Sequence, residues 1–152
     1  MGLLWKGLRL QWYGIQGMTW ESFISTFDKY VKSYPRPDYL IIQAGSNDLG
    51  IVKGKVLIEN IRADIMRSAI LYPDLKIIWS DILPRRYWHY GNNHGTIEGT
   101  RKTVNIAVRK VVKEEITAIQ ILQKRREHYI EMMVLIYPTL GTKFFLTTSR
   151  QL

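Results

Sequence analysis

The stretch Tyr39-Leu-Ile-Ile-Gln-Ala-Gly-Ser-Asn-Asp-Leu-Gly50 decides the predicted fold of this chain. Its apolar start breaks abruptly into Gly45-Ser-Asn-Asp48. Such a break is typical of a buried strand in a parallel sheet, whose C-terminal loop carries the chemistry. The amide of Asn47 is suited to face a developing oxyanion, and Asp48 is suited to fix the loop by accepting backbone N–H bonds. An ordinary turn after a strand is the alternative interpretation.

Helical and strand patterns alternate on both sides of this stretch. Thr19 is a suitable N-cap for the first helix. The predicted elements, in chain order, are a strand over 8–12, a helix over 20–32, a strand over 39–43, a helix over 55–71, a strand over 75–80, a helix over 97–113 and a strand over 116–122. This order predicts a three-layer α/β/α domain with a parallel sheet. The loops at 13–17, 45–50 and 80–93 should then meet at the C-terminal ends of the strands.

The composition limits the class of protein. The chain has 152 residues, of which 46% are apolar and 12% aromatic, as expected for a single globular domain. It has no cysteine, so disulfides and thiolate metal sites are excluded, and nothing in the sequence calls for a cofactor. We expect no membrane span, because no apolar run is long enough. The N-terminus lacks a signal-peptide pattern, which favours an intracellular over a secreted protein.

The formal charge of +9 is concentrated in the second half of the chain. One interpretation is a basic module that associates with nucleic acid through Arg85, Arg86, Tyr87 and Trp88, whose rings would stack on bases. The alternative is a helix with a solvated basic face. No zinc-finger or recognition-helix pattern accompanies the charge.

The three loops, in their order along the chain, resemble the SGNH (GDSL-type) hydrolase family. Gly17-Met-Thr19 is similar to the family's second block, and Gly45–Asp48 is similar to its third block, G-x-N-D. Two further segments, 79–88 and 101–105, resemble SGNH-like domains of vertebrate, retroelement-associated proteins. The resemblance covers about residues 8–125. It implies a flavodoxin-like strand order, an esterase- or lipase-type fold, an ester-type small molecule as ligand, and oxyanion-hole roles for Gly17 and Asn47.

The resemblance also implies two blocks that this sequence lacks. The family's nucleophilic serine follows its first strand, but no serine precedes residue 8. The family's base is the histidine of a D-x-x-H motif, and the residues three positions before His89, His94 and His128 are Arg86, Gly91 and Arg125. Ser46 stands at the variable position of G-x-N-D and is not expected to replace the nucleophile. The resemblance therefore implies a pseudoenzyme, with the first strand missing and no nucleophile or base identified.

The chain is predicted to divide into a partial SGNH-like domain, 1–125, and a divergent C-terminal tail, 126–152. Methionine has one codon, so shifting the reading frame by one base turns the junctions after Met132 and Met133 into codons for Asp and Gly. This suggests that the tail is the family's last block in a shifted frame, and a translated fragment without selected function is a further alternative. With the first strand missing, strands 8–12 and 39–43 should either pair directly or leave two unpaired edges.

Overall fold

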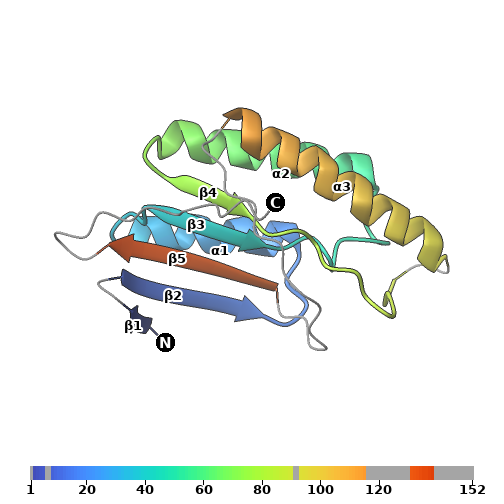
Figure 1. The fold of residues 1–152 in the computed structure, drawn as a ribbon, viewed down its shortest axis with the longest axis horizontal. Coiled ribbons are helices and arrows are strands. Elements are labelled where there is room, and N and C mark those ends of the chain that lie inside the picture. The colour runs from blue at the N-terminus through green and yellow to red at the C-terminus, as the bar shows by residue number, and fades with distance from the viewer. Residues whose placement is uncertain (1, 6–7, 91–92, 116–130, 139–152) are drawn as a thin grey trace, which may run out of the picture.

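A computed structural model gives the fold and describes residues 2–5, 8–90, 93–115 and 131–138 (Figure 1). The predicted helices and the first three predicted strands are confirmed, with small shifts at their ends. The predicted strand at 116–122 lies outside the described residues. The elements are β1 (Gly2–Trp5), β2 (Leu8–Ile15), α1 (Trp20–Ser33), β3 (Tyr39–Gln43), α2 (Gly54–Leu71), β4 (Lys76–Trp79), α3 (His94–Glu115) and β5 (Glu131–Pro138).

The sheet is mixed, and the prediction of a parallel sheet is wrong. Its strand order is β1-β2-β5-β3-β4, and only β3 and β4 pair in parallel. β5 runs antiparallel to both β2 and β3, so β2, β3 and β4 share one direction, as α1 and α2 crossovers require. β1 adds an antiparallel hairpin partner to β2. The flavodoxin-like order is therefore not present either.

β5 explains why neither expected outcome for strands 8–12 and 39–43 occurs. It lies between them, so they neither pair directly nor present two open edges (Figure 1). Five consecutive side chains of β5, Met133 to Tyr137, are buried. A strand with both faces covered needs apolar residues at every position, and this segment supplies them. The segment assigned to the divergent tail thus forms a central strand of the same sheet.

The two faces of the sheet carry separate apolar clusters. Leu40, Ile42 and Leu135 face a large cluster to which α1, α2 and α3 all contribute. Tyr39, Ile78, Val134 and Ile136 form a second cluster on the other face. The described helices therefore make one helical layer, and the predicted second helical layer is not found among the described residues.

Tyrosines join β2, α1 and β5 within the large cluster. The Tyr137 hydroxyl donates to the Tyr30 hydroxyl at 2.5 Å, and the Tyr13 ring meets the Tyr30 ring edge-on, with centroids 5.1 Å apart. Burial, reinforced by Tyr30, raises the pKa of Tyr13 to about 12 and raises the pKa of Tyr137 further. These phenols therefore stay neutral in the folded protein well above their usual titration range.

Candidate functional site

Glycine conformation shapes the loop that ends β3. Gly45 has a φ of 99°, and a Cβ added there would lie 3.2 Å from the Cδ1 of Ile82. A side chain at this position would be strained by its backbone and crowded by the loop after β4. The close approach brings the loop at 45–50 against the loop at 80–93, as the sequence predicts.

Asn47 connects all three predicted loops. Its side-chain Nδ2 donates to the backbone carbonyl of Met18 at 3.0 Å, and its Oδ1 accepts from Nη1 of Arg85 at 3.2 Å. Met18 directly follows Gly17, which has a φ of 75°. The structure therefore brings Gly17 and Asn47, the two predicted oxyanion donors, into adjoining loops. In this arrangement the Asn47 amide acts as a bridge between loops.

Arg85 is held in place by the same loop. Its Nη2 donates to Oγ of Ser46, and its guanidinium carbon lies 5.8 Å from the centroid of the Trp88 ring. Ser46 is 9% exposed, and its hydroxyl accepts this hydrogen bond at the boundary of the buried region. The serine beside Asn47 is thus engaged with an arginine in the described structure.

Asp48 fixes the loop to α1, as predicted. Its side chain is 5% exposed, and its Oδ2 accepts from the backbone N–H of Trp20, the first residue of α1, at 2.9 Å. Burial raises the pKa of Asp48, and the hydrogen bond from Trp20 opposes that shift. Thr19 is the N-cap of α1, as predicted, and its side chain accepts a hydrogen bond from the backbone N–H of Ser22. The start of α1 and the G-x-N-D loop therefore form one hydrogen-bonded unit.

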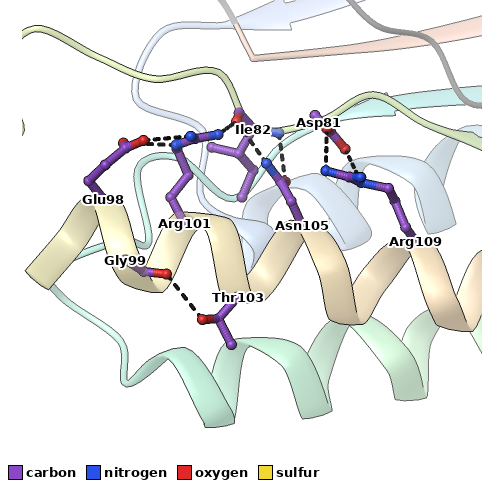
Figure 2. Close-up of polar contacts among 8 residues, drawn as sticks. All are labelled: Asp81, Ile82, Glu98, Gly99, Arg101, Thr103, Asn105 and Arg109. Atoms are coloured by element: carbon purple, nitrogen blue, oxygen red, sulfur yellow. Dashed lines mark hydrogen bonds and ion pairs between the residues drawn. The ribbon is translucent and has the colours of Figure 1, made fainter.

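A polar clamp from α3, which was not predicted from the sequence, holds the segment after β4 (Figure 2). Asn105 is 1% exposed; its Oδ1 accepts from the N–H of Ile82 at 2.9 Å, and its Nδ2 donates to the Ile82 carbonyl at 3.0 Å. Arg101 donates to the same carbonyl at 2.7 Å, and Arg109 makes a two-point ion pair with Asp81. The spacing of Arg101, Asn105 and Arg109 could have indicated this clamp, because residues four apart share one helix face.

The clamp changes the interpretation of the basic charge on α3. Arg101 also pairs with Glu98, which lowers the pKa of that carboxyl group. Arg101 and Arg109 are therefore compensated by acids, so they belong to the structure of the loop. The predicted solvated basic face of the helix therefore has two fewer uncompensated positive charges.

The loop proposed to contact nucleic acid divides into a buried and an exposed part. Trp88 is 6% exposed and belongs to the large apolar cluster, so the prediction that its ring stacks on bases does not fit the structure. Tyr87 is 67% exposed, and the guanidinium carbon of Arg86 lies 5.7 Å from its ring centroid. Of the four predicted residues, only Arg86 and Tyr87 together place a cation and an aromatic ring at the protein surface.

The two described histidines contact residues that are close to them in the chain. Nδ1 of His94 accepts from the backbone N–H of Trp88 at 3.4 Å, and the His89 ring lies edge-on to Tyr90, with centroids 6.5 Å apart. His128 lies outside the described residues. Within the described ranges, no group of three or more acidic or histidine side chains is placed to hold a metal ion. Nor does any helix there have the length and hydropathy needed to cross a membrane.

Comparison of the chain with protein-family models, with curated proteins and with solved structures gave no match. The resemblance to SGNH hydrolases therefore rests on the sequence blocks alone.

Proposed function

We propose that this chain is an SGNH-hydrolase-type pseudoenzyme, in which the loops that would stabilise an oxyanion serve to hold the domain together. The observation that carries the proposal is the bonding of Asn47. An oxyanion donor must aim its N–H at the reacting atom. Here one N–H of the Asn47 amide donates to the Met18 carbonyl, and the amide oxygen accepts from Arg85, so the orientation of this side chain is set by contacts within the domain.

The surroundings of the histidines support the same proposal. Hydrolysis by this chemistry requires a hydroxyl activated by an imidazole that a third group orients. None of the three histidines belongs to a D-x-x-H motif, and the described contacts of His89 and His94 are with residues close to them in the chain. Without an attacking group and a base, binding and polarisation of an ester would leave at most weak residual activity.

Hydrolysis of p-nitrophenyl acetate tests the proposal. We expect the wild-type chain, Asn47→Ala and the control Asn60→Ala to give the same slow rate, because exposed nucleophiles react equally in all three. Asn60 is an exposed residue of α2 and makes a matched amide-to-methyl change. Steady-state turnover well above buffer that disappears only in Asn47→Ala would show that the amide serves catalysis, and would refute the proposal.

A second candidate function, association with single-stranded nucleic acid, is favoured by one observation. Arg86 and Tyr87 form an exposed cation–aromatic pair on a chain of formal charge +9. Such pairs contact single strands by stacking and by charge. The ion pairs of Arg101 and Arg109 remove part of the charge on which this function would depend.

The salt dependence of binding to a labelled oligothymidine tests this candidate. If this loop contacts the oligonucleotide, the double variant Arg86→Ala with Tyr87→Ala should bind about tenfold more weakly. Arg36→Ala removes one positive charge at another place and should have only a small effect. Equal losses in the two variants would indicate attraction by net charge alone, and would refute a specific contact between this loop and nucleic acid.

A further inference from the structure

A groove between α1 and α2 differs in charge from the rest of this basic chain. It has a volume of about 470 Å³ and is bordered by the start of α1, the loop after Asp48 and the middle of α2. Glu21, Asp48 and Asp64 contribute three carboxylates to its lining, and no lysine, arginine or histidine is found among the described lining residues. A chain of formal charge +9 thus carries a locally acidic groove.

The groove also has apolar walls. Ile24, Val52 and Leu57 line it, and Ile51, at its edge, is 57% exposed. A large apolar side chain beside carboxylates suits a partner that combines an apolar stem with a cationic end. Lysine and arginine side chains have this chemistry.

Two of the three carboxylates of the groove are held in place by Trp20. Its backbone N–H donates to Asp48 at 2.9 Å, and its indole Nε1 donates to Asp64 at 2.8 Å. Asp64 also lies 3.6 Å from Arg67, which in turn pairs with Asp28. Burial is the main cause that raises the pKa of Asp48, and the negative charge of Glu21 adds to it, so these two carboxylates repel each other. A cation in the groove would relieve that repulsion.

We propose that this groove binds a basic peptide segment of a partner protein, with a lysine or arginine side chain entering between α1 and α2. Charge complementarity selects this occupant, because the described lining of the groove is acidic and apolar and includes no basic residue. The exposed Ile51 at the edge extends the apolar contact beyond one side chain, which suits a peptide. The proposal is independent of hydrolase function.

The test uses a capped hexapeptide with two lysines separated by leucine, titrated into the ¹⁵N-labelled full chain. The indole N–H signal of Trp20, assigned with Trp20→Phe, reports on the groove directly. We expect this signal to shift with the lysine peptide and to stay in place with a peptide in which norleucine replaces each lysine. Added salt should weaken binding.

Matched variants locate the binding site. Glu21→Gln with Asp64→Asn keeps the side-chain shapes and leaves an acceptor for the Trp20 indole, and we expect it to weaken binding by about tenfold. Glu59→Gln removes an acid from the exposed face of α2, outside the groove, and should leave affinity unchanged. A thermal melt of each variant checks that it is folded.

Three results would overturn the proposal. Equal binding by the double variant and Glu59→Gln would place the peptide elsewhere. Equal affinity for hexylammonium and for the peptide would mean that the groove is a site for small cations. Shifts of the Trp20 signal on dilution of the chain alone, with no further change on adding peptide, would mean that a second copy occupies the groove.

Discussion

The two halves of the sheet differ in how far apart in the sequence their paired strands lie. In the half formed by β3 and β4, neighbouring strands are joined by a helix and pair in parallel. In the half formed by β1, β2 and β5, strands pair antiparallel, and the partners of β5 lie at least 89 residues earlier in the chain, since Met132 pairs with Gln43. The first half follows from local sequence patterns, whereas the second depends on a long-range choice of partner.

The largest expected effect comes from the long-range half. Leu135 lies at the centre of β5 and is fully buried, so Leu135→Ala should lower the free energy of unfolding by about 3 kcal/mol. Urea titration monitored by circular dichroism measures the loss. Ile15→Ala, at a position of β2 that is 49% exposed, is the control and should cost much less. Similar small losses in both variants would indicate that β5 does not occupy the centre of the sheet.

Removal of the clamp tests the parallel half. Asn105→Ala leaves the N–H of Ile82 without its side-chain partner and weakens the hold on the Ile82 carbonyl, so we expect a loss of about 2 kcal/mol. Asn60→Ala, on the exposed surface of α2, provides the matched comparison. If both variants unfold at the same urea concentration, the clamp contributes nothing to stability.

The tyrosine contacts make the stability of the long-range half depend on pH. In the unfolded chain Tyr13 loses its proton near pH 10, whereas folding raises its pKa to about 12. Between these two pH values the folded state binds more protons than the unfolded state. The contribution of Tyr13 to the free energy of unfolding is therefore fully present below about pH 10 and is lost as the pH rises toward 12. Tyr137→Phe should cost about 1 kcal/mol near neutral pH and reduce this fall. An unchanged alkaline slope in Tyr137→Phe would contradict the burial of this phenol.

Asp48 gives the smallest expected change. Its pKa is raised by burial, so its contribution to stability is complete below the unfolded pKa of about 4 and is lost as pH rises through the folded pKa. Asp48→Asn keeps an acceptor for the Trp20 N–H and removes the buried charge. We expect it to change stability by less than about 0.5 kcal/mol near pH 7 and to remove the pH dependence that Asp48 contributes. A loss of several kcal/mol would show that the charge itself holds α1 to the loop.

The sequence predicted the parallel half well, for physical reasons that are local. The apolar run at Tyr39–Gln43 and the periodicity of α1 and α2 fixed the crossover units, and Thr19 and Asp48 have the capping and loop-fixing roles predicted. The apolar segment that forms β5 was visible too. Its partners were not, because an apolar run does not specify which strands it joins or in which direction.

The candidate site was predicted in part. Gly17, Asn47 and the loop at 80–93 do lie together, since strand ends determine where loops meet. What the Asn47 amide binds depends on Met18 and Arg85, and this could not be predicted from spacing. Trp88 illustrates the opposite error: a basic and aromatic neighbourhood suggested an exposed ring, but the ring fills the core.

Nuclear Overhauser contacts of β5 test the account most directly. With β5 between β2 and β3, Val134 should show contacts to both Trp12 and Ile41, and Met133 should show contacts to both Tyr13 and Ile42. This order of contacts requires antiparallel pairing on both sides. Direct contacts between β2 and β3, or contacts of β5 in parallel order, would contradict the mixed sheet.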